Sequence, residues 1–197
     1  MEETLVFIDS GFLSKLSRHF GKGKYLIYNI IDFAENLAKK QNLECKHIFY
    51  YTSPPFQSPI PSKTEEKKKD GYDRFTNKLK IRGVIVREGR CQRLKIDGEF
   101  TFKQKAVDVL LAMDLTNVLL EYKNVKRIIL ISSDSDFVPV IKNLEKKGVR
   151  TILYTYYEKK RNTPFSRSNH LIKSVYRYIL LKKEDFDSAK LKKKEEK

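Results

Sequence analysis

Cysteine and histidine are scarce in this sequence of 197 residues, and their scarcity argues against several kinds of site. The only cysteines are Cys45 and Cys91, and they do not form a Cys-x-x-Cys pair. We therefore expect neither a disulfide scaffold nor a structural zinc site, and a reducing cytoplasm is the simplest setting. The three histidines, His19, His47 and His170, are scattered along the chain, so a histidine-based metal site is not expected either.

Long apolar runs are also missing. The first apolar run, Leu5–Ile8, is short and ends at Asp9, which does not match the layout of a signal peptide. No other run approaches the roughly 20 apolar residues that a membrane span needs. The sequence therefore predicts a soluble protein with no membrane partner.

Acidic residues are too few to balance the basic ones. Lysine and arginine total 41 against 25 aspartate and glutamate residues, which gives a net charge of +16. Such a surplus attracts polyanions and favours phosphate contacts through the release of counterions. Solvated surface lysines offer a second explanation, so the charge by itself makes nucleic acid only one candidate partner. The hydrophobic content of 40% is sufficient for the core of one domain.

Short apolar segments alternate with amphipathic segments along the chain. Continuously apolar strands that alternate with helices predict an α/β fold, in which a mainly parallel sheet is covered on both faces. The expected strands are Leu5–Ile8, Cys45–Tyr51, Val84–Arg87, Arg127–Ile131 and Thr151–Thr155. The expected helices are Tyr25–Gln41, Ser62–Ile81, Lys103–Tyr122 and Phe137–Lys147, and a short helix and an edge strand are expected within Leu171–Leu181.

Three segments interrupt this alternation. A proline cluster at residues 54–61 predicts a loop, and Asp97-Gly98 between two β-prone runs predicts a small hairpin with a type I′ turn over residues 93–102. Residues 156–169 are polar and irregular. The tail, residues 182–197, lacks apolar periodicity and is expected to be disordered, so the folded domain is predicted to span residues 1–181.

Aspartates follow two of the predicted central strands. Asp9 ends the first strand, and Asp134 and Asp136 come directly after Arg127–Ile131. In parallel α/β sheets, sites form beyond the carboxyl ends of the strands. Asp108 is near the start of the helix Lys103–Tyr122, which runs into the strand Arg127–Ile131, so it is expected at the same end. We therefore predict that the four carboxylates meet in one cleft.

Clustered carboxylates repel one another and raise each other's pKa, and a divalent cation removes that penalty. Mg²⁺ and Mn²⁺ prefer oxygen ligands, and such ions orient phosphodiesters and activate water. Structural roles remain open for each residue, since aspartates also cap helices, form turns or complement a helix dipole. Asp114 is expected to support the site indirectly, as are Ser133 and Ser135 beside the aspartates.

Three segments carry a resemblance to a known family. Val6–Asp9, Lys105–Leu115 and Ile131–Ile141 occur in the order found in the NYN domain family, a branch of the PIN-like nuclease superfamily, and closely resemble it. The matches span roughly residues 4–155. Gly148 also matches the glycine that usually precedes the next strand of that family.

This resemblance implies a three-layer α/β/α PIN-like fold and an endoribonuclease that depends on Mg²⁺ or Mn²⁺, with no organic cofactor. Asp9, Asp108, Asp134 and Asp136 would be the catalytic metal ligands. One departure is that Phe12 stands where the family commonly has an asparagine, and Ser10 is a candidate to contact the ligand instead. An inactive module that binds RNA, and a nuclease directed at DNA, remain the alternatives.

Basic and aromatic residues around these segments are candidates for nucleic-acid contacts. Lys105 is the first choice for a phosphate contact, although a solvated lysine at a helix start is an equally good explanation. The other candidates for phosphate contacts are Lys103, Arg87, Arg90 and Arg93, with a broader basic surface on the helix that carries Lys63–Lys80. Tyr156, Tyr157, Phe165 and Arg167 are candidates to stack on unpaired bases, or else they pack locally.

Overall fold

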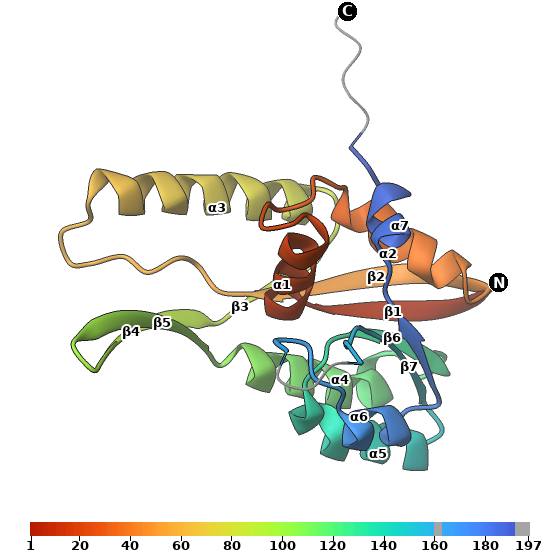
Figure 1. The fold of residues 1–197 in the computed structure, drawn as a ribbon. Coiled ribbons are helices and arrows are strands. Elements are labelled where there is room, and N and C mark those ends of the chain that lie inside the picture. Colours follow the sequence, from red (N-terminus) through yellow and green to blue (C-terminus); the bar gives the residue numbers. More distant parts are fainter. Residues whose placement is uncertain (160–162, 192–197) are drawn as a thin grey trace, which may run out of the picture.

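The computed structural model describes residues 1–159 and 163–191. Its centre is a six-stranded sheet with the strand order β3-β2-β1-β6-β7-β8, in which every pairing is parallel (Figure 1). The strands are β1 (Glu2–Asp9), β2 (Leu43–Thr52), β3 (Ile85–Glu88), β6 (Arg127–Ile131), β7 (Arg150–Thr155) and β8 (Arg177–Leu180). The predicted α/β fold with a mainly parallel sheet is thus confirmed.

Helices cover both faces of the sheet and bury its alternating side chains. In β1, Val6 and Ile8 belong to one core cluster, whereas Leu5 and Phe7 belong to the other, and all four are fully buried. Side chains of a strand alternate between its faces, so a sheet covered on both sides needs a continuous apolar run. The helices on the first face are α1 (Ser10–Phe20), α2 (Ile30–Lys39), α3 (Lys63–Ile81) and α7 (Lys183–Asp187); those on the second are α4 (Val107–Glu121), α5 (Val138–Lys146) and α6 (Asn169–Ser174).

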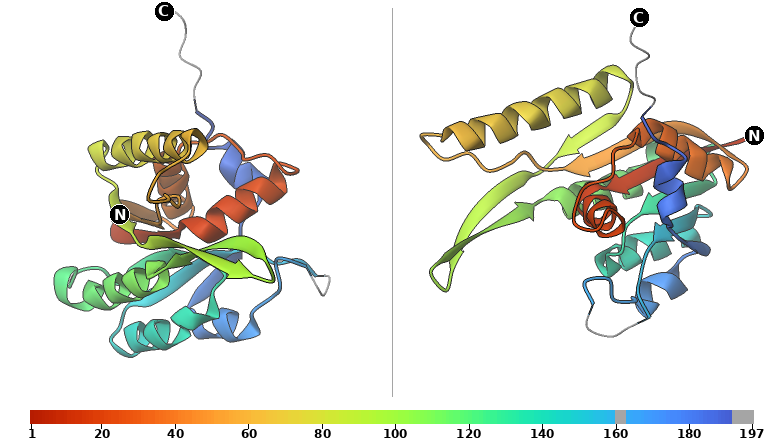
Figure 2. Two further views of the ribbon diagram at one scale, coloured as in Figure 1. Left: turned by 90° about the vertical axis from the view of Figure 1, so that its left-hand side faces the viewer. Right: turned by 45° about the horizontal axis from the view of Figure 1, so that its top comes forward.

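The predicted hairpin is present and is longer than expected. Strands β4 (Arg90–Ile96) and β5 (Glu99–Lys105) pair antiparallel and project from the carboxyl end of the sheet, alongside α3 (Figures 1 and 2). Asp97 and Gly98 have φ values of 49° and 85°. Both are positive, as a type I′ turn requires.

One helix was not expected from the sequence, and two others begin later than expected. The turn expected after β1 is instead the start of α1, because the carboxylate of Asp9 caps a helix that begins at Ser10. The next helix begins at Ile30, not Tyr25, because Asn29 caps it. Helix α4 begins at Val107, so Lys103 and Lys105 lie on strand β5 and not in the first turn of a helix.

The described part of the segment after Leu181 is folded, although the sequence predicted a disordered tail from residue 182. It forms α7, in which Phe186 is 1% exposed and packs against the rings of Tyr28 and Phe33, each with centroids 4.9 Å away. A single aromatic residue in a charged segment produces no periodicity, so the sequence pattern did not reveal this contact. Residues 192–197 of the predicted tail lie outside the described residues. No helix in the described part of the chain is long and apolar enough to cross a membrane.

Candidate active site at the carboxyl ends of β1 and β6

Asp9 stands where β1 ends and α1 begins, and its carboxylate joins three elements. One oxygen, Oδ1, accepts a hydrogen bond from the backbone N–H of Phe12 at 3.1 Å, which caps α1. The other, Oδ2, accepts one from Ser132 Oγ at 3.0 Å, in the segment that follows β6. The half-buried carboxylate is therefore held in a fixed position between two neighbouring strands.

The segment after β6 is a chain of short hydrogen-bonded turns. Ser132 Oγ accepts a hydrogen bond from the N–H of Asp134 at 3.2 Å, and Asp134 Oδ1 accepts one from the N–H of Asp136 at 2.9 Å. Asp134 thereby caps the short 3-10 helix η1 (Ser135–Phe137) that leads into α5. Asp9 and Asp134 therefore both cap a helix, which is the structural role that the sequence had left open for them. Capping occupies one oxygen of Asp134 and leaves its other oxygen without a protein donor among the described residues.

Asp108 connects the four carboxylates electrostatically. It lies exposed in the first turn of α4. Partial burial raises the pKa of Asp108, and the negative charges of Asp134 and Asp136 raise it further. Burial also raises the pKa of Asp9; hydrogen bonds from Phe12 and Ser132 oppose that shift, and the charge of Asp108 adds to it. Asp108 is thus close enough to each of the other three carboxylates for their charges to repel its own.

No cation from the protein relieves this repulsion within residues 1–159 and 163–191. None of the four aspartates takes part in an ion pair there, although the chain has 41 basic residues and other carboxylates are paired. Neighbouring carboxylates without counter-charges are costly for a folded protein. A bound cation would remove this cost.

The donor atoms of this site suit a hard divalent cation. All four candidate ligands are carboxylates, which Mg²⁺ and Mn²⁺ prefer to nitrogen or sulfur. As the side chains stand, no three of the histidine, cysteine, aspartate or glutamate residues in the described ranges are grouped closely enough to hold a metal ion. The arrangement is therefore a set of neighbouring carboxylates with the right chemistry, and not a complete coordination shell.

Asp114, one and a half turns beyond Asp108 on α4, belongs to a separate ion pair. Its carboxylate accepts two hydrogen bonds from the guanidinium of Arg87, both at 2.8 Å, and a third from the hydroxyl of Tyr51 at 2.9 Å. Asp114 is 8% exposed, so its charge requires such partners. Because Asp114 accepts hydrogen bonds from two of the three guanidinium nitrogens of Arg87, this arginine is a poor candidate for the phosphate contact expected from the sequence.

The other basic candidates divide between the two faces of the hairpin. Arg90 lies opposite Lys105 in the pairing register, and Lys103 lies opposite Gln92, so these three basic side chains share one face. All three are exposed. Arg93 is on the other face, where its guanidinium packs over the rings of Phe56 and Phe100 at 4.8 and 4.5 Å. One face of the hairpin therefore carries three exposed basic side chains, and the other combines two phenylalanine rings with Arg93 and Lys95.

The hairpin joins α4 through a constrained backbone. Ala106 has a φ of +66°, a left-handed conformation that costs energy for any residue with a side chain. A Cβ at Gly89 would lie 2.3 Å from the carbonyl oxygen of Lys105, so only glycine fits at the start of the hairpin. These two positions constrain the backbone at both ends of the hairpin.

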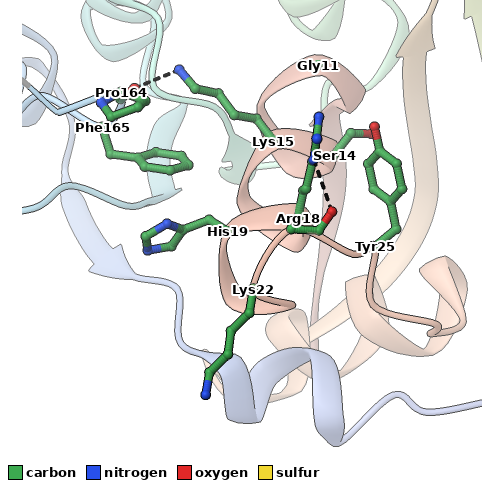
Figure 3. A pocket seen from close by; sticks show the side chains of 10 residues that line it. Gly11, Ser14, Lys15, Arg18, His19, Lys22, Tyr25, Pro164 and Phe165 are labelled. Atoms are coloured by element: carbon green, nitrogen blue, oxygen red, sulfur yellow. Dashed lines mark hydrogen bonds between the residues drawn. The ribbon is translucent and has the colours of Figure 1, made fainter.

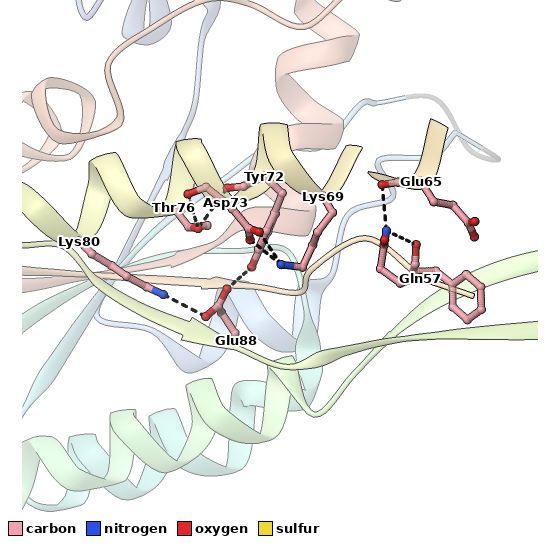
Figure 4. A network of polar contacts seen from close by, with 9 residues as sticks. Gln57, Glu65, Lys69, Tyr72, Asp73, Thr76, Lys80 and Glu88 are labelled. Carbon is pink, nitrogen blue, oxygen red and sulfur yellow. Dashed lines mark hydrogen bonds and ion pairs between the residues drawn. The ribbon is translucent and has the colours of Figure 1, made fainter. Parts of the chain in front are cut away.

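Helix α3 has fewer free charges than its sequence suggests. Lys69 pairs with Asp73 one turn away, and Lys80 pairs with Glu88 on β3 at 3.1 Å (Figure 4). Glu88 also accepts a hydrogen bond from the hydroxyl of Tyr72 at 2.7 Å. Part of the basic surface expected on this helix therefore holds α3 against the edge of the sheet.

Several other candidates lie inside the protein. Phe165 is 5% exposed and packs against His19 and Tyr156, with ring centroids 4.9 and 5.2 Å away, so the local-packing alternative is correct for this residue. Ser10 is 4% exposed and Phe12 is 6% exposed. The side chain of Phe12 therefore fills the core under α1, and only its backbone N–H contacts the site, where it donates to Asp9.

Two polar residues at the site were not among the acidic and basic candidates. Ser132 bridges Asp9 and Asp134, as described above. Gln104 reaches the same region from β5: a Cβ placed on Gly11 would lie 3.2 Å from Asp9 Oδ1 and 3.5 Å from Gln104 Oε1. An amide side chain thus lies near Gly11 and Asp9, although position 12 lacks one. Sequence spacing contains no signal for a contact between the hairpin and α1.

Comparisons with known proteins agree with this arrangement. The family model described as NYN domain matches residues 3–180, which is nearly the whole chain. A solved structure of a protein of unknown function from Vibrio parahaemolyticus is similar, with a TM-score of 0.60 and 17% sequence identity over 94% of this chain and 95% of that one. At this identity the likeness shows the fold alone. No curated protein matches the sequence.

Proposed function

The chain belongs to the NYN domain family, whose members are generally nucleases, and on that premise we propose that it is an endoribonuclease that depends on Mg²⁺ or Mn²⁺. RNA is the proposed substrate, and the reaction is hydrolysis of a phosphodiester bond with no covalent enzyme intermediate. The aspartates at the carboxyl ends of β1 and β6 are the proposed centre.

One observation carries this proposal. Four carboxylates at one edge of the sheet have no ion-pair partner within the described residues, and those of Asp9 and Asp108 have a raised pKa. The same chain has a net charge of +16, so a shortage of basic residues does not explain the missing partners. Uncompensated carboxylates of this kind are typical of a cation site.

Asp9, Asp108, Asp134 and Asp136 would hold the ion. When bound, such an ion polarises the phosphodiester and makes water a better nucleophile at neutral pH. Ser132 and the N–H of Phe12 keep the carboxylate of Asp9 in place. On the hairpin, the basic face of Arg90, Lys103 and Lys105 would neutralise phosphates of the bound strand.

Cleavage of labelled single-stranded RNA in Mn²⁺ tests the proposal. The wild type is compared with Asp134→Asn, and Asp70→Asn is the matched control, because Asp70 is an exposed aspartate on α3 outside the site. We expect Asp134→Asn to lose on the order of 100-fold or more of the rate, and Asp70→Asn to keep it. Equal cleavage by Asp134→Asn and the wild type would exclude this site.

Two further arms separate the alternatives. A DNA strand of the same sequence is tested in parallel, and preferential cleavage of DNA would replace RNA as the substrate. Binding is measured on the same samples in EDTA. Salt-sensitive RNA binding without products in any divalent metal would identify a binding module of the same fold.

A further inference from the structure

A basic groove runs along the exposed side of α1 (Figure 3). Its volume is about 680 Å³. One wall is α1 and the turn that follows it, and the other includes the segment at residues 164–165. The groove is lined by Gly11, Ser14, Lys15, Arg18, His19, Lys22, Gly23, Tyr25, Pro164 and Phe165.

The groove has the opposite charge from the neighbouring site. Lys15, Arg18 and Lys22 line it and are exposed, and no lining residue is acidic. His19 also lines it, but its ring lies 3.4 Å from Glu158, so we count only three basic groups toward an anion. Three cations on one side of a hollow favour a ligand with several negative charges.

The basic side chains are partly held in place. The Nε of Arg18 donates a hydrogen bond to the carbonyl oxygen of Gly23 at 3.1 Å. The Nζ of Lys15 donates one to the carbonyl oxygen of Pro164 at 2.6 Å and lies 5.0 Å from the centre of the Phe165 ring. Each interaction uses only some of the donors of its cation. The remaining donors are preorganised for a ligand, which reduces the entropy lost on binding.

An exposed aromatic ring completes the groove. Tyr25 is 65% exposed and lines the hollow beside the cations. Bases stack on such a ring only when they are unpaired, and stacking between a base and an aromatic side chain is insensitive to sequence. A phosphate chain with planar, unpaired groups fits this combination better than an acidic peptide does.

One end of the groove lies close to Asp9 of the proposed active site. Gly11 lines one end of it, and a Cβ on Gly11 would lie 3.2 Å from the carboxylate of Asp9. A strand that occupies the groove would therefore reach the aspartates without leaving the surface of the protein. Glycine at this position keeps the passage open, because any side chain would stand beside that carboxylate.

We propose that this groove binds the single-stranded flank of the substrate RNA on one side of the cleavage point. Lys15, Arg18 and Lys22 contact its phosphates, and Tyr25 stacks on one of its bases. This inference rests on the proposed function for the role of the adjoining aspartates. The binding itself does not depend on cleavage, so the two can be tested separately.

Binding of fluorescently labelled single-stranded RNA, measured by anisotropy in EDTA, tests the groove. The variant Lys22→Asn removes one lining cation, and asparagine tolerates the positive φ of +52° at that position. Lys24→Asn is the matched control, because Lys24 is exposed two residues away and does not line the groove. We expect Lys22→Asn to weaken binding about three- to tenfold and to reduce the salt dependence by roughly one phosphate contact.

The control should change affinity less than about twofold. If Lys22→Asn and Lys24→Asn have equal effects, only net charge matters and the groove is excluded. Tyr25→Ala should weaken binding of single strands more than of duplexes, and Tyr25→Phe should restore it. Equal losses in Tyr25→Ala and Tyr25→Phe would contradict stacking. Thermal melting of each variant checks that it is folded.

Shortening the RNA from one end locates the strand. In the wild type, removal of the nucleotides that occupy the groove should weaken binding, and in Lys22→Asn the same removal should have a smaller effect. If shortening the RNA at either end has an effect that simply adds to that of Lys22→Asn, the assignment is overturned. Poly-glutamate that competes as well as RNA would also overturn it. Binding that depends on the groove, without metal-dependent cleavage, would reject the proposed function and support the groove. Cleavage that Lys22→Asn does not change would support the proposed function and reject the groove.

Discussion

Strands β1 and β6 lie side by side, and acidic residues occur at both ends of the pair. At the amino end, Glu2 accepts hydrogen bonds from the guanidinium of Arg127 at 3.0 and 2.7 Å, and the hydrogen bond to Arg127 lowers the pKa of Glu2. At the carboxyl end, Asp9 meets Ser132 and the charge of Asp108, and burial raises its pKa. The pKa of a carboxylate is thus lowered at the amino end of this strand pair and raised at the carboxyl end.

The difference separates structural carboxylates from those that we propose to be functional. Where a charge only has to be accommodated, an arginine lies opposite it, as at Glu2 and again at Asp114. At the carboxyl end, the chain leaves the carboxylates without basic partners within the described residues. The folded state bears that repulsion, which a ligand can then relieve.

The largest expected effect comes from Asp108→Asn. Because Asp108 interacts with the charges of the other three aspartates, we expect cleavage to fall on the order of 100-fold or more. In EDTA, however, the thermal unfolding midpoint should stay equal or rise, because a repelling charge is removed. RNA cleavage and differential scanning fluorimetry on one preparation measure both. A lower midpoint together with lower activity would mean that Asp108 is a structural residue.

Removal of the buried pair, in contrast, should lower the stability of the fold. Asp114→Ala leaves Arg87 and the hydroxyl of Tyr51 without their shared partner. Breaking a well-buried pair costs about 3–5 kcal/mol, and the partial exposure of Arg87 reduces the expected loss to roughly 2–3 kcal/mol. Urea denaturation measures the free energy of unfolding. A change below about 0.5 kcal/mol would show that this pair contributes little to the fold.

Mn²⁺ should stabilise the wild type by a smaller amount. A ligand that binds only the folded state adds about 1.4 kcal/mol at ten times its dissociation constant, so we expect a rise of a few degrees in the unfolding midpoint at millimolar Mn²⁺. Asp108→Asn should lose this rise, and Glu2→Gln at the opposite end should keep it. Equal shifts in both variants would place the ion elsewhere.

The smallest expected effect is at the amino end. The pair of Glu2 and Arg127 is partly exposed, so Glu2→Gln should cost about 0–1 kcal/mol. Because the pKa of Glu2 is lowered in the folded state, its contribution is present above the unfolded value of 4.5 and is lost as the pH falls through the folded value. Urea denaturation at pH 7 and at pH 3 measures this. The wild type and Glu2→Gln should differ at pH 7 and converge toward pH 3.

The centre of the sheet was predictable because the middle of its inner strands is buried on both faces. Runs such as Leu5–Ile8 and Arg127–Ile131 must be apolar at every position, which gives a strong local signal. Helix α1 had no such signal, because Ser10 and Gly11 read as a turn after Asp9. The start of α4 was also missed, since the unusual φ of Ala106 has no counterpart in composition.

The placement of the candidate site residues was predictable only as far as topology dictates it. Parallel strands bring their carboxyl ends together, so the closeness of Asp9 and Asp134 followed from the strand order. The bridge from Ser132, the approach of Gln104 and the groove along α1 depend on contacts between distant segments. Neither residue spacing nor charge counts contain that information.

A crystal soaked in Mn²⁺ tests the central claim most directly. The claim is that Asp9, Asp108, Asp134 and Asp136 share a divalent cation. An anomalous difference map calculated at the manganese absorption edge should contain a peak among these carboxylates, and Asp134→Asn crystals treated in the same way should show it weakened or absent. A fully soaked crystal with no peak there, or with manganese only at other carboxylates, would contradict the claim.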